Sequence, residues 1–580
     1  MAYPAPHPAT TDLKPLPVPP LDDTLDAYAH ALAAVLEGSE LEYAEGLVDK
    51  FRSGAGPRLD AQLRERASVR EEAGTNWLND EWYSSYLTTR SPLTLASNVG
   101  FQLFFPAVEG TEGAEGFERA AEFIRRAATV HLAAASGGIT EETDARGNRI
   151  TMNQWFVYAG GIRHPEEGED RIIASQLGAQ NREIGVFVDG RLFALPVSDG
   201  DGAILSVKDL RTGLEEARDR ARSGTGKIDF NAPSLLGSGV LAELLPAILE
   251  RDGNAAVYER LSDMLFTVEL QDGSSRSDAE RIREATFTPR GAWVYKPLSY
   301  LVDLDSDWVS VHVEHSGQDG ATLVAAVGRM QDAELPDSPA GTPAMPEELT
   351  WDLDDTTAEQ ITAQLDSFRN KAERFTADII TVPHNVPADL PFKISRDASA
   401  QLIMTIAQQL AYGYVRAVYE AVDMREFRAG RTECLRAATP EAVAFAQKLV
   451  DATATPSDLQ SALDAHRAWV KRCKSGNGFD RHIQMMATID DSDSFFTDRT
   501  VTAARRDFLS TTSIGGADQI VRYCFAPTLP EGFGISYTPL PGDTEFCVSW
   551  NTSTAERADK FRTSIATASK LFWEFCGEIA

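Results

Sequence analysis

The sequence predicts an α/β protein built from two domains. At 580 residues the chain is longer than a single hydrophobic core usually organises, and 43% apolar with 9% aromatic residues supply enough side chains for two cores. In both halves, segments with the period of a helix are mixed with shorter segments that have the two-residue period of a strand. Four prolines and a glycine between residues 335 and 346 interrupt both patterns, as is typical of a crossing between domains. We therefore place the domain boundary at residue 350.

Residues 1–98 are predicted to form a helical segment that packs on the C-terminal domain. The run Leu16-Pro17-Val18-Pro19-Pro20 is expected to be extended, and residues 21–51 carry apolar side chains at helical spacing. Aromatic residues cluster in the run Trp77-Leu78-Asn79-Asp80-Glu81-Trp82-Tyr83. Such side chains are usually buried as anchors of helix packing, so we assign them no chemistry.

Residues 99–350 are predicted to form an N-terminal α/β domain, and residues 351–580 a C-terminal α/β domain. In the first domain we expect a helix over 115–135 and strands over 184–188, 191–195 and 308–313. In the second domain, long helical patterns precede short strand patterns. The helices are expected over 357–381, 398–420, 440–451 and 456–474, and the strands near 519–525, 533–537 and 545–550.

The charge of the chain argues against nucleic acid and anionic membranes as partners. The formal net charge is −32, and Lys and Arg do not gather into basic runs that could neutralise a phosphate backbone. No stretch reaches the roughly 18 consecutive apolar residues of a membrane span, and the first 20 residues lack the basic and apolar regions of a secretory signal. We therefore expect a cytoplasmic protein.

Cysteine usage agrees with a reducing compartment. The chain has five cysteines, an odd number, all in the last third and without Cys-x-x-Cys spacing. This pattern predicts free thiols and indicates neither a disulfide framework nor a zinc site. The cysteines stand at positions 434, 473, 524, 547 and 576.

The run Val311-His312-Val313-Glu314-His315-Ser316-Gly317-Gln318-Asp319-Gly320 is the first candidate for catalysis. The alternation over 308–313 predicts a strand, and Gly317 and Gly320 allow the backbone to turn where the strand ends. His315 is thereby delivered into a turn that a substrate could reach, which suits a general base. An isolated histidine of this kind is more often a hydrogen-bonded core residue, so the local pattern leaves both interpretations open.

Other familiar motifs are incomplete. Gly237-Ser238-Gly239 lacks the third glycine of a dinucleotide-binding turn, and Gly224-Thr225-Gly226-Lys227 is followed by Ile228, where a phosphate-binding loop has Ser or Thr. His312 and His315 are three residues apart on a strand pattern, which predicts side chains on opposite faces, and no acidic or cysteine pattern completes a metal site. We expect a mechanism that uses no metal.

Motifs along nearly the whole chain resemble those of the carnitine/choline acyltransferase family, in the family's order. The resemblance implies two α/β domains of chloramphenicol-acetyltransferase-like topology, an active-site tunnel at their interface, and acyl transfer without a covalent enzyme intermediate. The motifs are Leu16-Pro17-Val18-Pro19-Pro20, Trp77-Leu78, Met152-Asn153-Gln154, Glu314-His315-Ser316-Gly317-Gln318-Asp319-Gly320, Tyr419-Glu420, Gly430-Arg431-Thr432, Phe479-Asp480-Arg481-His482, Ser510-Thr511-Thr512 and Gly532-Phe533-Gly534-Ile535-Ser536-Tyr537.

The resemblance also implies catalytic roles. His315 matches the family's general base, which takes the proton of a hydroxyl as that hydroxyl attacks an acyl thioester and then protonates the departing thiolate. Asp319, where the family often has Glu, is expected to steady the turn or the imidazole ring. Thr512 falls on the last residue of the family's Ser-Thr-Ser motif, so its hydroxyl is expected to donate to the tetrahedral oxyanion.

The acceptor is inferred from charge. Tyr419, Thr432 and Arg481 occupy the family's positions for the carboxylate of carnitine, and the Ser510 hydroxyl is expected to meet the carboxylate or the ammonium end. A buried carboxylate needs a cation and hydrogen-bond donors, whereas choline has no carboxylate to balance an arginine. These residues favour carnitine, and another β-hydroxy acid or a zwitterionic alcohol remains open as the acceptor.

The donor site departs from the family pattern. Two lysines four residues apart hold the coenzyme A phosphate in the family, and Val386 and Leu390 fall on their positions here. We expect no tightly bound cofactor, because the acyl thioester is a co-substrate, carried by coenzyme A or by the phosphopantetheine arm of an acyl carrier protein. The residues expected to contact the donor are Asp397, Glu420, Lys393 and Arg396.

Tyr523 falls on the position that limits acyl chain length in short-chain members of the family. Its bulk predicts short or unusual acyl groups and excludes long fatty chains.

Three hypotheses follow. The first is a monomeric O-acyltransferase that moves a short acyl group from coenzyme A to carnitine or a carnitine-like alcohol. The second keeps acyl transfer but replaces the donor, the acceptor or both, as in a biosynthetic pathway that draws on a carrier protein. The third is a non-catalytic binding protein on the same scaffold, against which the presence of His315 and Thr512 argues.

Overall fold

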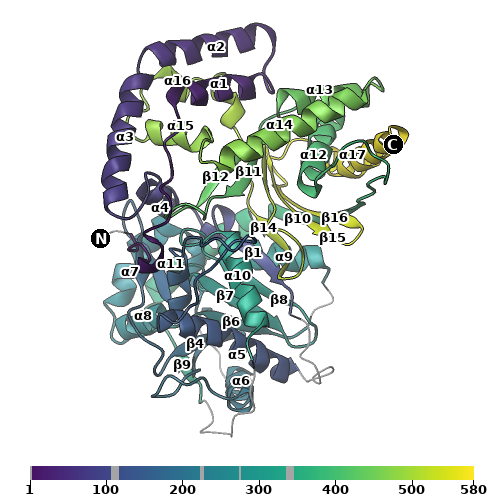
Figure 1. Ribbon diagram of the computed structural model, residues 1–580. Helices are drawn as coiled ribbons and strands as arrows, with labels where there is room; N and C mark the ends of the chain where they lie inside the picture. Colours follow the sequence, from purple (N-terminus) through teal and green to yellow (C-terminus); the bar gives the residue numbers. More distant parts are fainter. Residues whose placement is uncertain (1–2, 106–115, 223–227, 274–275, 335–344) are drawn as a thin grey trace.

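Two β-sheets with helices on their faces form two α/β domains, one above the other in Figure 1. The computed structural model describes residues 3–105, 116–222, 228–273, 276–334 and 345–580. This architecture confirms the predicted α/β class. No helix in the described ranges is long and apolar enough to cross a lipid bilayer.

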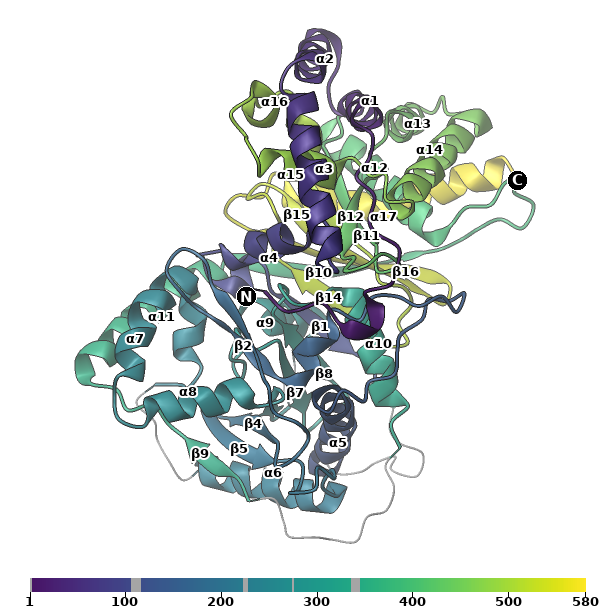
Figure 2. The same ribbon diagram turned by 60° about the vertical axis from the view of Figure 1, so that its left-hand side comes forward.

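Four N-terminal helices lie against the upper domain, and through them the chain descends from the top of the molecule to the boundary between the domains (Figures 1 and 2). Tyr28 packs edge-on against Phe479 and Phe495, in the apolar core of the upper domain. The ring of His482 is hydrogen-bonded to the carboxylate of Asp60 at 3.0 Å. These contacts attach the N-terminal helices to the C-terminal part of the chain. The helices are α1 (Leu21–Leu32), α2 (Gly38–Ser53), α3 (Gly56–Glu72) and α4 (Asn79–Leu87).

The lower domain is built on an eight-stranded sheet with the order β14-β1-β8-β7-β6-β4-β5-β9. Apolar residues of α5, α6 and α10 pack on one face of the sheet, and those of α7, α8 and α9 pack on the other. The strands are β1 (Val99–Leu103), β4 (Glu183–Val188), β5 (Arg191–Pro196), β6 (Thr267–Gln271), β7 (Leu298–Asp303), β8 (Val309–Val313), β9 (Glu347–Leu349) and β14 (Ile520–Phe525), with β2 (Gly161–His164) and β3 (Arg171–Ala174) as a separate hairpin. The helices are α5 (Gly116–Ala135), α6 (Val207–Arg222), α7 (Ser238–Leu249), α8 (Asn254–Asp263), α9 (Asp278–Phe287), α10 (Gly320–Gln331) and α11 (Asp355–Ala372).

The upper domain is built on a six-stranded sheet with the order β10-β16-β15-β13-β11-β12. Helices α12, α13, α14 and α17 bury one face of this sheet, and the other face is turned toward the lower domain. The strands are β10 (Phe375–Pro383), β11 (Val418–Asp423), β12 (Thr432–Arg436), β13 (Leu509–Thr512), β15 (Phe533–Leu540) and β16 (Asp543–Asn551). The helices are α12 (Arg396–Tyr412), α13 (Pro440–Val450), α14 (Pro456–Lys474), α15 (Asp480–Ala487), α16 (Ser494–Thr497) and α17 (Ala558–Glu578).

Strand β14 connects the two domains. It lies in the C-terminal part of the chain but pairs antiparallel with β1 of the lower sheet, with Phe101 opposite Tyr523 and Val99 opposite Phe525. The hydroxyl of Ser536 on β15 donates to the carbonyl of Tyr523 at 2.5 Å, which ties the same strand to the upper sheet. Strand β14 is therefore a member of the lower sheet that also contacts the upper sheet.

Two predicted helices extended too far toward the C-terminus. Residues 375–383 form strand β10, although a helix was expected to residue 381, because this run rich in β-branched side chains pairs with β16 along its whole length. Residues 418–420 belong to strand β11, although a helix was expected to residue 420. Gly413, whose φ of +83° ends α12, is the local signal that could have placed this boundary.

Candidate active site

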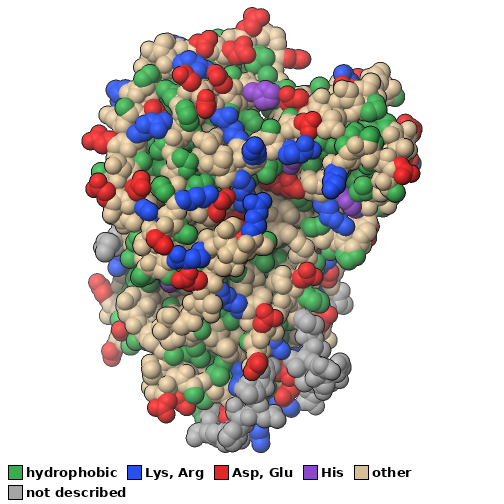
Figure 3. Space-filling model, viewed as in Figure 1, with side chains coloured by type: hydrophobic (Ala, Val, Ile, Leu, Met, Phe, Trp, Pro, Cys, Tyr) green, Lys and Arg blue, Asp and Glu red, His purple; other side chains and the backbone are tan. Residues whose placement is uncertain are grey.

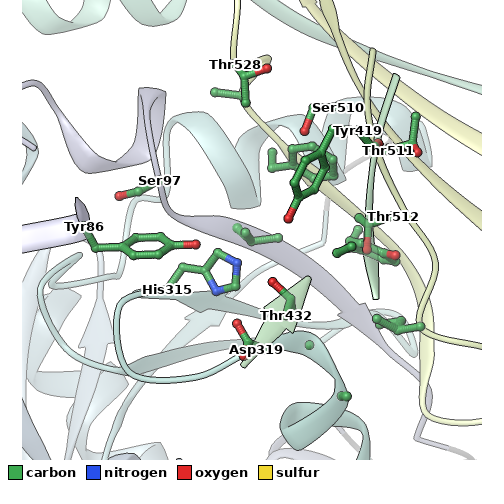
Figure 4. Close-up of a pocket in the computed structure, with 18 of the residues that line it drawn as sticks. Tyr86, Ser97, His315, Asp319, Tyr419, Thr432, Ser510, Thr511, Thr512 and Thr528 are labelled. Atoms are coloured by element: carbon green, nitrogen blue, oxygen red, sulfur yellow. Dashed lines mark hydrogen bonds between the residues drawn. The ribbon is translucent and has the colours of Figure 1, made fainter. Parts of the chain in front are cut away.

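A cavity of about 590 Å³ lies where the two domains meet (Figure 4). The turn between β8 and α10, helix α4 and strand β1 contribute to its wall, together with β11, β13 and β14. The cavity brings together eight of the residues singled out in the sequence. They are His315, Asp319, Tyr419, Thr432, Arg481, Ser510, Thr512 and Tyr523.

His315 follows the end of β8, and its ring faces the interior of the cavity (Figure 4). Its Nδ1 is 2.7 Å from the carbonyl oxygen of Gln318. A carbonyl only accepts, so Nδ1 carries the proton and Nε2 of the neutral ring keeps a lone pair. Burial lowers the pKa of His315 below 6.5, and the charge of Asp319 opposes this shift. At neutral pH the imidazole is therefore an uncharged base.

Gly317 allows the turn of His315 to pack tightly. A Cβ atom at this position would lie 2.7 Å from Cγ1 of Val157, which is too close, and 3.1 Å from the ring of Phe156, which is a tight contact. The turn is also braced by Ser316, whose hydroxyl donates to the carboxylate of Glu314 at 2.6 Å. The position of the imidazole is thus set by packing around it.

Within the described residues, the hydrogen bonds of Asp319 hold the turn and do not include the imidazole of His315. Its carboxylate accepts from Nε and Nη2 of Arg431, at 2.7 and 3.1 Å, and from the amide of Gln154, at 2.8 Å. Burial opposes ionisation of Asp319, but the charge and hydrogen bonds of Arg431 outweigh it and lower the pKa. Of the two roles expected for Asp319, the geometry supports steadying of the turn, with an electrostatic effect on the ring.

Arg431, from the motif Gly430-Arg431-Thr432, lies next to the catalytic turn. Its side chain is buried and also donates to the carbonyl of Ser316 at 2.8 Å. Its guanidinium carbon lies 5.2 Å from the centre of the Trp82 ring. Arg431 therefore connects the C-terminal domain to the turn that carries His315.

A positively charged group lines the acceptor end of the cavity. Nη2 of Arg481 donates to the Tyr419 hydroxyl at 3.0 Å, and Nε donates to the carbonyl of Thr432 at 3.1 Å. Burial opposes the charge of Arg481, but Tyr419 and the carboxyl groups of Glu433 and Asp480 raise its pKa and keep it a cation. Burial also raises the pKa of Tyr419 to about 12, so its hydroxyl stays protonated. Ser510 lies beside Tyr419 on the adjacent strand, so the cavity offers a cation and hydroxyls to an anion.

Two aromatic residues of α4 belong to the cavity wall, although we had assigned no chemistry to this segment. The Trp82 ring lies 4.7 Å from the guanidinium carbon of Arg481, and Tyr86 meets the His315 ring edge-on, with centroids 5.4 Å apart. Tyr86 is drawn beside His315 in Figure 4. The N-terminal segment thus contributes to the site through packing between distant parts of the chain, which no local pattern reveals.

Thr512 and Tyr523 form the side of the cavity opposite Tyr86. Thr512 ends β13, and Figure 4 shows it across the cavity from His315. Tyr523 lies on β14 and stacks on Phe101, with centroids 5.2 Å apart. Burial raises the pKa of Tyr523, so its phenol is neutral.

The four residues expected to contact the donor lie outside this cavity. Glu420 follows Tyr419 on β11 and therefore points to the other face of the sheet, toward the helices. Burial and the nearby carboxylate of Asp397 raise the pKa of Glu420 well above its ordinary value. The neutral acid then donates to Tyr537, and the Tyr537 hydroxyl donates to Asp397 at 2.5 Å.

The remaining donor candidates are near the molecular surface. Arg396 donates to the carbonyl oxygens of Leu540 and Asp543, at 2.8 and 3.0 Å, and Lys393 is exposed. Asp397, 41% exposed at its side chain, also contacts Nε2 of His466 at 2.8 Å. Their contact with a donor stays a prediction.

Comparisons with known proteins extend along nearly the whole chain. A model of the choline/carnitine O-acyltransferase family matches residues 16–567. Carnitine O-acetyltransferase of Mus musculus is 26% identical over 571 residues, which cover 93% of this chain and 90% of the relative. Choline O-acetyltransferase of Homo sapiens is 24% identical over 588 residues, which cover 95% of this chain and 77% of the relative. Mitochondrial carnitine O-palmitoyltransferase 2 of Rattus norvegicus is 25% identical over 579 residues, which cover 90% of this chain and 86% of the relative.

Proposed function

Because the chain belongs to the choline/carnitine O-acyltransferase family and is an acyltransferase, we propose that it moves a short acyl group from a coenzyme A thioester to the hydroxyl of carnitine or a carnitine-like alcohol. One observation carries this proposal. The free Nε2 side of His315 faces a cavity that also contains the Thr512 hydroxyl and the Arg481 guanidinium. A base, an oxyanion donor and an anchor for an anionic acceptor are thus within one space.

His315 acts as the general base. Its Nε2 accepts the proton of the acceptor hydroxyl while the hydroxyl oxygen attacks the thioester carbonyl, and the resulting imidazolium gives that proton to the departing thiolate. The hydrogen bond from Nδ1 to the carbonyl of Gln318 fixes the tautomer that this requires. The acyl group passes directly between the substrates, so no covalent enzyme intermediate forms.

Thr512 stabilises the tetrahedral intermediate. Its position across the cavity from His315 suits a hydroxyl that donates to the oxyanion formed from the thioester carbonyl.

The acceptor is selected by its carboxylate. Arg481 supplies the charge, and Tyr419, Thr432 and Ser510 supply hydroxyl groups at the same end of the cavity. An alcohol without a carboxylate would bring no anion to Arg481 from the cavity and would lose this charge-assisted contact. Carnitine is therefore favoured over choline.

A second candidate function differs in the donor. Val386 and Leu390 stand where two lysines would hold the phosphate of coenzyme A, and Val386 is exposed to solvent. A phosphopantetheine arm on a carrier protein would not need these lysines. Figure 3 shows several Lys and Arg side chains around the hollow between the domains, and their charge would attract either anionic donor.

We further propose that the enzyme is a cytoplasmic monomer, in which the five cysteines, buried and free, stay reduced.

Release of free thiol tests these candidates. Acetyl-coenzyme A and an acetylated acyl carrier protein are each incubated with the enzyme and with carnitine, choline or no acceptor. Carnitine-dependent release from coenzyme A is expected. Release only from the carrier protein would replace the first candidate by the second. If the His315→Ala variant transfers acyl groups as fast as the unaltered enzyme, the mechanism is wrong.

A further inference from the structure

Alternate side chains of two neighbouring strands, β1 and β14, form the wall of the cavity beside Thr512. Val99 and Phe101 on β1, and Tyr523 and Phe525 on β14, all line the cavity. They are opposite one another in the antiparallel register, Val99 with Phe525 and Phe101 with Tyr523. Successive residues of a strand face opposite sides of the sheet, so Gly100 on β1 and Cys524 on β14 face away from the cavity.

Strands β1 and β14 have no room to move away from the cavity, because α9 packs directly against their other side. A Cβ atom at Gly100 would lie 2.4 Å from Oγ1 and 2.9 Å from the backbone nitrogen of Thr286, so β1 is pressed against that helix. Cys524, the residue of β14 that faces the same way, belongs to the small core formed with α9. A longer ligand therefore cannot push the two strands back without moving α9.

Phe101 and Tyr523 form the centre of this wall. Their rings stack with centroids 5.2 Å apart and an angle of 20°, and their exposed fractions are 4% and 2%. Phe101 also approaches the catalytic turn, since its ring lies 3.9 Å from a Cβ atom built at Gly320, the residue after Asp319. A chain that extends from the reacting carbonyl would meet both rings.

We propose that Phe101 is a second determinant of acyl-chain length, and that Phe101 and Tyr523 together limit the donor to acetyl-sized and propionyl-sized groups. The proposal rests on the acyltransferase function proposed above and names its acyl class. The two rings support each other, so the loss of one leaves the other in the path of the chain. A tight apolar pocket of this kind discriminates against one additional methylene by about tenfold to 200-fold.

Rates with a series of acyl-coenzyme A thioesters test the proposal. The measured quantity is the ratio of kcat/KM for octanoyl to that for acetyl thioester, in the unaltered enzyme, Phe101→Ala, Tyr523→Ala and the double variant. Each single variant is expected to raise the ratio by about tenfold at most, and the double variant by more than the product of the two. An unchanged ratio on substituting Phe101, alone and in the Tyr523→Ala background, would overturn the proposal.

A matched control lies on the same strand. Cys524→Ala removes a side chain next to Tyr523 that faces α9, and it is expected to leave the ratio unchanged. If the double alanine variant does not fold, Phe101→Leu with Tyr523→Leu keeps more apolar volume and is expected to raise the ratio in the same direction.

Binding of 1-octanol separates this proposal from the proposed function. An opened apolar chamber takes up such a ligand, and binding to the folded state raises the Tm. We expect 1-octanol to raise the Tm of the double variant but not that of the unaltered enzyme or of Cys524→Ala. If this rise occurs and no thioester is a substrate, only the proposed function fails. An equal response of all three proteins would show that the two rings do not close the chamber.

Discussion

Arg431 donates two hydrogen bonds to the carboxylate of Asp319, at 2.7 and 3.1 Å, and so joins the C-terminal domain to the turn that carries His315. Both side chains are buried, with exposed fractions near 5% and 10%. An ion pair in this position contributes to the geometry of the base more than to its chemistry, because neither charge touches the imidazole nitrogen that accepts the proton.

Breaking this pair is expected to lower both activity and stability. Arg431→Gln leaves a buried carboxylate without its cation, which costs about 3–5 kcal/mol of folding free energy. A displaced imidazole lowers kcat by roughly 100-fold while the KM for the acceptor changes little. Urea unfolding and steady-state rates measure the two effects. Combining Arg431→Gln with Asp319→Asn removes both charges and is expected to recover stability; no recovery would argue against the pair as the cause.

The activity of His315 is expected to persist into mild acid. Burial lowers the pKa of His315 below 6.5, so the ring stays neutral, and able to accept a proton, at pH values where an exposed histidine is protonated. The acid limb of the profile of kcat/KM against pH is therefore expected to be centred below pH 6.5. His315→Gln is expected to lower kcat by about 10²–10⁴-fold at about pH 7.5 and to remove this limb. An acid limb centred at or above pH 6.5 would contradict this assignment.

Arg481 is expected to govern acceptor binding. Arg481→Ala removes the charged partner of the acceptor carboxylate at a cost of about 2 kcal/mol or more, which raises the KM for carnitine by roughly 30-fold. The kcat at saturating carnitine is expected to change much less, since the substitution is remote from the bond that breaks. Choline serves as the comparison, and its KM is expected to change little. An equal loss with both alcohols would argue against carboxylate recognition.

Glu433 is expected to make acceptor binding dependent on pH. Burial raises the pKa of Glu433 to about 7, while Arg481 opposes the shift and Asp480 adds to it. Below pH 7 the acid is neutral and the charge of Arg481 is available to the acceptor. Above pH 7 the carboxylate opposes that charge, so the KM for carnitine is expected to be higher at pH 8 than at pH 6. Glu433→Gln is expected to abolish this difference, and a persistent difference would assign it to another group.

The donor site is expected to improve when lysines are introduced. Val386→Lys with Leu390→Lys supplies two cations to the coenzyme A phosphate and is expected to lower the KM for acetyl-coenzyme A by about tenfold. Dephospho-coenzyme A thioester, which lacks the 3′-phosphate, is the control and is expected to gain little. An equal gain with both thioesters would mean that the lysines act through general charge.

The sequence predicted the position of His315 better than the surroundings of the site. The alternation before His315 and the glycines after it are local signals, and they describe β8 and the turn correctly. Trp82 and Tyr86 could not be found in this way, because they reach the cavity only when α4 packs against both domains. Strand pairing over long distances likewise decided β10 and β11, where helical patterns continued in the sequence.

The donor residues show a different limit of sequence reasoning. Tyr419 and Glu420 are neighbours in the chain, and only their place on a strand sends one to the cavity and the other to the helical layer. The expected domain limits at residues 98 and 350 also stay predictions. What the sequence does describe well is the set of residues whose positions depend on a single turn or strand end.

The position of β14 between the two sheets gives the cavity a wall that both parts of the chain share. The strand is paired with β1 in the lower sheet, and the hydroxyl of Ser536 on β15 in the upper sheet donates to its backbone. A movement that separated the two domains would have to break this contact.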